Sequence, residues 1–186
     1  TPDGGWGWFK GMYPSQEITL YILKGMSQLT ELNAVEYNQQ EKEMQMKALK
    51  FVDKQIQSDY EALQKIKNWQ KNEISPLEIE YLFVRSNYRD IPELGSAREA
   101  IRYYTNLAEK QWDKQSIHGK GEIAWLMWRN GNKEIAGKII TWLRKTASIS
   151  PDKGMYWANN RSRANAFASP IDTHCLLMAF FNEVSP

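Results

Sequence analysis

The sequence predicts an all-α fold built from antiparallel helical hairpins. Serine and asparagine caps stand at the expected helix starts, apolar residues recur at spacings of three and four, and no segment alternates as a strand does. Connections between the expected helices are mostly short, which makes consecutive helices antiparallel neighbours. The exceptions are two long aromatic segments, residues 1–14 and 148–168. We expect about seven helices and no sheet.

Length and composition fit one soluble domain. The chain has 186 residues, of which 42% are hydrophobic and 25% charged, and we expect a single domain over residues 1–186. The formal net charge of +2 arises from mixed signs, which argues against a nucleic-acid partner. No apolar run approaches the roughly 20 residues that a membrane-spanning helix needs.

Two helices are expected in the first part of the chain. Ser15 is placed to cap the first, which has an apolar stripe spaced by three and four residues: Ile18, Ile22, Gly25, Leu29 and Leu32. A long polar helix is expected over residues 38–72, with its own apolar stripe: Ala48, Val52, Ile56, Tyr60, Leu63 and Ile66. The lysines and acids on its other face indicate a solvated surface.

Two capping boxes mark the next helices. Ser75-Pro76-Leu77-Glu78 combines a cap, a first-turn proline and a reciprocal Glu, and predicts a helix to about Tyr88. Ser96-Ala97-Arg98-Glu99 predicts another. Its expected buried residues are Ala97, Ile101, Tyr104, Ala108 and Trp112.

Three helices complete the expected fold. The first spans about residues 119–130 and ends at Gly131, after which Asn132 begins a helix with Ile135, Ile139 and Leu143 on one face. Ser169-Pro170-Ile171-Asp172 repeats the cap-proline-acid pattern and predicts a last helix to about Val184.

Cysteine and histidine are too sparse for a metal centre. Cys175 is the only cysteine, so no internal disulfide forms, and its apolar neighbours predict burial. His174 is adjacent to Cys175, so the two side chains point about 100° apart on a helix. The segment His118-Gly119-Lys120-Gly121 is interpreted as a plain turn and not as an anion site. We expect no metal and no cofactor.

The two aromatic segments have similar sequences, and this similarity is called the echo below. Asp3-Gly4-Gly5-Trp6-Gly7-Trp8 precedes Ser15 and Thr19, and Asp152-Lys153-Gly154-Met155-Tyr156-Trp157 precedes Ser169 and Thr173. Each combines an acid, a glycine turn and aromatic residues, and a capped helix with Thr in its first turn follows. Such an echo favours a closed or solenoidal helical array with equivalent loops at one end.

These motifs together resemble bacterial alpha-2-macroglobulin-like proteins. The turn Pro2-Asp3-Gly4-Gly5-Trp6 with the following helix resembles the Asp-Gly-Gly-aromatic turn of α/α toroids. Terpenoid cyclases, protein prenyltransferase β subunits and thioester-containing domains share this turn. Within the macroglobulin-like family, a later Tyr-Trp loop leads to a Ser/Asn-Pro-Ile-acid-Thr helix, here Tyr156-Trp157 and Ser169 to Thr173. The resemblance covers both ends of the chain.

The resemblance implies an incomplete α/α toroid that is not catalytic. The chain begins in mid-loop, which indicates the middle portion of a larger toroid in a longer parent protein. The family's Cys-x-Glu-Gln thioester motif is absent, because Cys175 is followed by Leu176-Leu177. The family implies proteases and other domains of the parent as partners, and a periplasmic or cell-surface location. Exposed apolar edges of the fragment favour a homodimer.

The candidate site residues are aromatic: Trp6, Trp8, Tyr156 and Trp157. Two interpretations stay open: they plug the end of the helical array, or they form a surface that faces a partner or shields a thioester from water. We expect no catalytic residue. One alternative function is a toroid enzyme acting on a carbohydrate or an isoprenoid-type substrate, and a second is a helical protein-interaction module.

Overall fold

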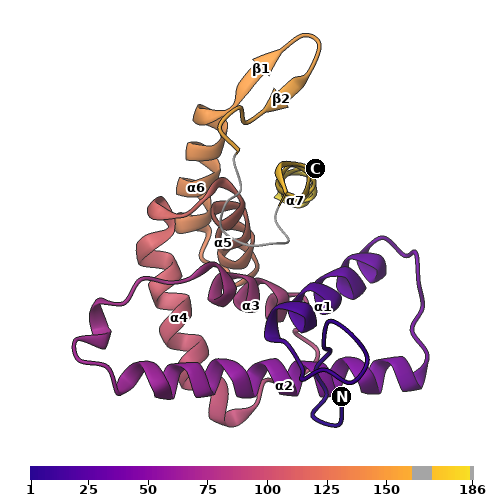
Figure 1. Cartoon of the computed structure of the whole chain (residues 1–186). Coiled ribbons are helices and arrows are strands. Elements are labelled where there is room, and N and C mark those ends of the chain that lie inside the picture. The colour runs from indigo at the N-terminus through magenta and orange to yellow at the C-terminus, as the bar shows by residue number, and fades with distance from the viewer. Residues whose placement is uncertain (161–168, 185–186) are drawn as a thin grey trace. The chain divides into compact units, whose positions relative to one another are not determined.

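The computed structural model describes residues 1–160 and 169–184 (Figure 1). These residues form seven α-helices and one small sheet, which confirms the all-α character. The chain divides into two compact units. Unit 1 comprises Thr1–Glu73 and Glu80–Thr105, and unit 2 comprises Ile74–Ile79 and Asn106–Pro186. The single domain over residues 1–186 stays a prediction.

The helices follow one another in the predicted order. In chain order they are α1 (Gln16–Glu31), α2 (Gln39–Gln64), α3 (Pro76–Ser86), α4 (Arg98–Gln111), α5 (Ile117–Arg129), α6 (Lys133–Thr146) and α7 (Pro170–Val184). Short 3-10 turns lie at Trp69–Lys71, Gly95–Ala97 and Trp112–Lys114. Strand β1 (Ser148–Ser150) pairs antiparallel with β2 (Gly154–Tyr156), and Ile149 lies opposite Met155.

Local capping chemistry forms the helix starts as predicted. The Ser15 hydroxyl accepts a hydrogen bond from the Ile18 amide at the start of α1. Ser75 and Glu78 form the reciprocal capping box before α3, at 2.6 Å and 3.4 Å. Asn132 caps α6 directly after Gly131, whose φ of 81° suits a glycine. These starts are confirmed because they depend only on residues within one helical turn.

Unit 1 has α2 as its longest element, and α1 packs beside it. The predicted stripe of α2 is confirmed at its centre, where Ala48, Val52 and Ile56 are fully buried. The predicted stripe of α1 is wrong, since Leu29 and Leu32 are exposed. The buried residues of α1 are instead Thr19, Leu20, Leu23 and Ser27. Burial of Ser27 is tolerated because its hydroxyl donates to Lys24 and accepts from Asn87.

A buried polar cluster holds three segments of unit 1 together. Asp53 of α2 accepts hydrogen bonds from the Tyr81 hydroxyl at 2.8 Å and from the Leu94 amide at 3.0 Å. The Arg85 guanidinium lies 3.2 Å from the same carboxylate, and both side chains are buried. Burial, reinforced by the charge of Asp53, raises the pKa of Tyr81, so the phenol stays a donor.

Unit 2 is centred on α5, which packs against α6 and α7 (Figure 1). Gly121 allows the close approach of α7, because a Cβ there would lie 2.8 Å from the Leu177 side chain. The interpretation of His118-Gly119-Lys120-Gly121 as a turn is therefore wrong: all four residues are buried within α5. Ser116 caps this helix, and packing against α7 compensates for the low helix propensity of its glycines.

Four other expectations are corrected. The long polar helix ends at Gln64 and not near residue 72, and Asn68 takes a left-handed conformation beyond it. Ser96 lies in a 3-10 turn, and α4 begins at Arg98. The prediction that the chain has no sheet is wrong for residues 148–156, which form two strands. Each strand has only three residues, too few for an alternation of polar and apolar residues to be recognised. The thiol of Cys175 is exposed, because α7 packs through Leu176, Leu177 and Phe180.

Candidate functional site

A pocket of about 400 Å³ lies in unit 2 at the start of α5. Residues from four places in the sequence line it: the segment before and at the start of α5, the second half of α6, the start of β1, and the segment after β2. They include Gln115, Ser116, His118, Trp142, Trp157 and Asn160. The lining combines indole rings with neutral amides and hydroxyls, a composition suited to a polar organic molecule.

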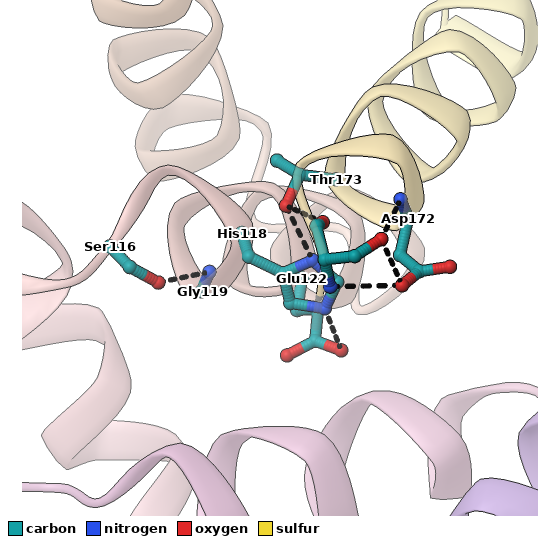
Figure 2. A network of polar contacts seen from close by, with 7 residues as sticks. Ser116, His118, Gly119, Glu122, Asp172 and Thr173 are labelled. Atoms are coloured by element: carbon teal, nitrogen blue, oxygen red, sulfur yellow. Dashed lines mark hydrogen bonds and ion pairs between the residues drawn. The ribbon is translucent and has the colours of Figure 1, made fainter. Parts of the chain in front are cut away.

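A buried hydrogen-bond network lies beside this pocket and joins α5 to α7 (Figure 2). His118 Nδ1 lies 3.1 Å from the Thr173 hydroxyl, and His118 Nε2 lies 3.2 Å from a carboxylate oxygen of Glu122. The Thr173 hydroxyl also lies 3.2 Å from the Ser169 carbonyl oxygen. All three side chains are buried, so the network is withdrawn from solvent.

The direction of these hydrogen bonds follows from the tautomer of His118. A hydroxyl has one hydrogen, so Thr173 either donates to the Ser169 carbonyl and accepts from Nδ1, or donates to Nδ1. In the second arrangement, a neutral His118 donates from Nε2 to the Glu122 carboxylate. In either arrangement both ring nitrogens lie against a polar partner, which makes the burial of His118 tolerable.

A hydroxyl, an imidazole and a carboxylate in hydrogen-bond contact are also the groups of a catalytic triad. Thr173 has no exposed surface, whereas a nucleophile must reach its substrate. We conclude that the network fastens α5 to α7 and is not arranged for attack on a substrate.

Lys120 is a buried cation of α5 that contacts two residues lining the pocket, Gln115 and Trp142. Its ammonium donates to the carbonyls of Asp113, at 2.8 Å, and Gln115, and it lies 4.6 Å from the ring centroid of Trp142. Burial lowers the pKa of Lys120, and the carboxylate of Asp113 partly opposes this effect. The carbonyls and the ring therefore compensate the lysine for its lost hydration.

Two of the predicted site residues lie in unit 2. Trp157 is 5% exposed, donates from its indole nitrogen to the Leu143 carbonyl at 3.0 Å, and stacks on Phe181 with ring planes 5° apart. Tyr156 is half-buried at the end of β2, with Lys153 over its ring. Trp157 is thus part of the packing of unit 2 and also a wall of the pocket.

The other two predicted site residues, Trp6 and Trp8, lie in the N-terminal loop of unit 1. The Trp6 amide donates to the Thr19 hydroxyl at 2.9 Å, and its carbonyl accepts from the Ser15 amide at 2.8 Å. Trp8 is 51% exposed. The preceding turn requires its glycines, because Gly4 has a φ of 96° and a Cβ at Gly5 would lie 2.7 Å from the Phe51 ring. The loop is therefore anchored to α1 and α2 while Trp8 faces outward.

Sequence reasoning missed the two ionisable residues of the network. His118 and Glu122 are four positions apart, the spacing at which helical side chains meet. That signal was present, but the two glycines between them favoured a turn. Thr173 was noted only as part of the echo, and its contact with His118 spans 55 residues of sequence.

Replacing Thr173 with Val is expected to lower the free energy of unfolding by about 1–3 kcal/mol, because His118 then loses a buried hydrogen-bond partner. Urea denaturation of the full chain measures this difference. The matched control is Thr141→Val on the exposed face of α6, where a change within about 0.5 kcal/mol is expected. Equal stabilities for the two variants contradict the structural role given to the network.

The described residues contain neither a cluster of metal-binding side chains nor a helix suited to span a membrane. Across residues 1–160 and 169–184, no group of three or more His, Cys, Asp and Glu side chains could hold a metal ion. In the same part of the chain, no helix has the length and apolar character needed to cross a membrane. Comparison with known protein families, curated proteins and solved structures finds no match for this chain.

Proposed function

We propose that this chain is part of the helical toroid of an alpha-2-macroglobulin-like protease trap and acts there as a scaffold, not as a catalyst. The proposal rests on the sequence resemblance of both chain ends and on one structural observation, the matching construction of two helix starts. It implies proteases and other domains of the parent as partners, and a periplasmic or cell-surface location.

The two helix starts match in detail although they lie far apart in the sequence. Ser15 and Ser169 each accept a hydrogen bond from the amide three residues later, at 3.3 Å and 3.1 Å. Thr19 and Thr173, each four residues after its serine, are fully buried, and their hydroxyls lie within hydrogen-bond distance of the carbonyl of that serine. A repeated local construction of this kind is characteristic of arrays of equivalent helical hairpins.

Both threonine hydroxyls have a second partner. Thr19 accepts from the Trp6 amide of the N-terminal aromatic loop, and Thr173 lies within hydrogen-bond distance of His118. In both places the first turn of a helix anchors a neighbouring segment of its own unit. This supports a scaffold that positions neighbouring loops, since the polar groups at these two points are committed to internal contacts.

The protease-trap proposal is tested on the whole natural protein that contains this chain. After incubation with an active endopeptidase, we expect cleavage of a large protein substrate to fall while cleavage of a small peptide substrate continues, because enclosure excludes only the large substrate. Endopeptidase inactivated before mixing is the control for adsorption. Undiminished cleavage of both substrates contradicts the proposal.

Methylamine incorporation, followed by intact mass, then separates two forms of trap. A mass increase mapped to a Cys–Gln pair elsewhere in the parent indicates covalent trapping, with this chain as part of the thioester's housing. An unchanged mass in freshly prepared, non-reduced protein indicates a trap that acts by enclosure alone.

A further inference from the structure

We propose that the pocket at the start of α5 binds a neutral carbohydrate, of one or two sugar rings. This activity goes beyond the scaffold role and does not depend on it, because the pocket lies wholly within unit 2. A volume of about 400 Å³ is within the range of small-molecule sites, roughly 300–1,000 Å³.

The first argument is charge. Among the described residues that line the pocket, none is Asp, Glu, Lys or Arg. Among the same described residues the one ionisable side chain is His118, which has both ring nitrogens in contact with Thr173 and Glu122. Against this part of the lining a charged ligand would lose hydration without gaining an opposite charge, which is costly. The described part of the lining therefore favours a ligand without net charge.

The neighbouring cation does not change this conclusion. Lys120 directs its ammonium to the carbonyls of Asp113 and Gln115 and to the face of Trp142. Its donors are committed to these internal contacts, so it supplies no positive group to an anion in the pocket.

The second argument is the combination of ring and amide surfaces. Trp142 is half-buried and lines the pocket, so part of its indole is available to the apolar C–H face of a sugar ring. Trp157 forms a rigid wall, because its indole is fixed by Leu143 and by the parallel ring of Phe181. Trp157 is only 5% exposed and Phe181 covers one of its faces, so Trp142 is the surface against which the sugar ring packs. A side chain that is already held in place loses little conformational entropy on binding.

The third argument is the set of donors and acceptors. Gln115, Asn159 and Asn160 bring amides, and Ser116, Thr146 and Ser148 bring hydroxyls. Three of these groups already direct a hydrogen to a backbone carbonyl: Gln115 to Gln111, Thr146 to Trp142 and Asn160 to Pro170. Their oxygen atoms can still accept from sugar hydroxyls, which both donate and accept. Asn160 is buried and preorganised, since its amide nitrogen donates to the Pro170 carbonyl at 3.0 Å and lies 3.2 Å from His174. Such a pocket pairs with several hydroxyl groups at once.

The test measures sugar binding to the full chain. Methyl glucoside, methyl galactoside, methyl mannoside, N-acetylglucosamine and the disaccharide maltose are each titrated to about 10 mM, with saturation-transfer NMR and tryptophan fluorescence as readouts. For a ligand of this size we expect a Kd of about 1 mM for at least one sugar. N-acetylglycinamide and inorganic phosphate are the rival probes, one a neutral amide and the other an anion.

Two variants locate the binding. Trp142→Ala is expected to weaken the sugar at least tenfold, with Trp128→Ala, a half-buried tryptophan of α5 outside the pocket, as its control. Asn159→Ala changes an exposed side chain and should leave the fold intact while weakening binding about threefold, with exposed Asn182→Ala as its control. The proposal is overturned if no sugar binds saturably, if only a rival probe binds, or if sugar binding is unchanged in Asn159→Ala.

Discussion

Replacing Asp53 with Ala is expected to lower the free energy of unfolding by about 3–5 kcal/mol, because it breaks a buried ion pair by removing one partner. Asp53 and Arg85 have side chains that are 2% and 4% exposed. Without the carboxylate, the guanidinium of Arg85 remains buried with an uncompensated charge. Its hydrogen bond to the Ile91 carbonyl, at 3.1 Å, cannot replace that counter-ion.

The loss extends beyond the ion pair. The Tyr81 hydroxyl and the Leu94 amide both donate to Asp53, and both lose an acceptor in the variant. Tyr81 is fully buried, so water does not readily replace the carboxylate as acceptor for its hydroxyl. We therefore expect Tyr81→Phe, which removes one donor and leaves the carboxylate in place, to cost about 1 kcal/mol.

Urea denaturation of the full chain, followed by tryptophan fluorescence, measures these differences. Asp59→Ala is the matched control, since Asp59 is exposed on the same helix and a change within about 0.5 kcal/mol is expected. The double variant Asp53→Leu with Arg85→Met should recover much of the stability, because it removes both charges. A loss from Asp53→Ala no larger than that from Asp59→Ala contradicts the role given to the cluster.

Replacing Trp157 with Ala is expected to lower the free energy of unfolding by about 3–5 kcal/mol, the range for truncating large aromatic residues in a core. The indole is 5% exposed, stacks on Phe181 and donates to the Leu143 carbonyl. Truncation removes these contacts together and leaves a cavity between α6 and α7. The Leu143 carbonyl also accepts from the Ala147 amide, so the lost packing dominates over the lost hydrogen bond.

Trp8→Ala is the matched comparison, because Trp8 belongs to the other aromatic loop and is 51% exposed. We expect it to change stability by about 0.5 kcal/mol. Thermal and urea unfolding of both variants measure the contrast. A similar loss of stability in the two variants contradicts the assignment of Trp157 to the core and of Trp8 to the surface. This contrast also separates the two interpretations of the aromatic residues that the sequence left open.

Much of the fold could be predicted because helix starts depend on nearby residues. The boxes at Ser75 and Ser169 are formed as the cap-proline-acid pattern predicts, each within four residues. The centre of α2 was predictable because Ala48, Val52 and Ile56 recur every four residues, which places them on one face of a largely polar helix.

The candidate site was less predictable. Its groups come from α5, α6, β1 and the segment after β2, and no local pattern links them. Of the four aromatic residues chosen from the sequence, Trp157 lines the pocket, while Trp142, His118 and Asn160 were not chosen. Trp142 and Asn160 carry no local signal that distinguishes them from ordinary helix and loop residues.

Local sequence is enough to predict the all-α class, the order of the helices and the two matched helix starts, since capping and periodicity act within one or two turns. Which face of each helix is buried depends on long-range packing. Leu29 and Cys175 are exposed, whereas Ser27 and His118 are buried, each with hydrogen-bond partners elsewhere in the chain. Polarity alone cannot predict such burial, because its cost depends on partners that only the fold brings within reach.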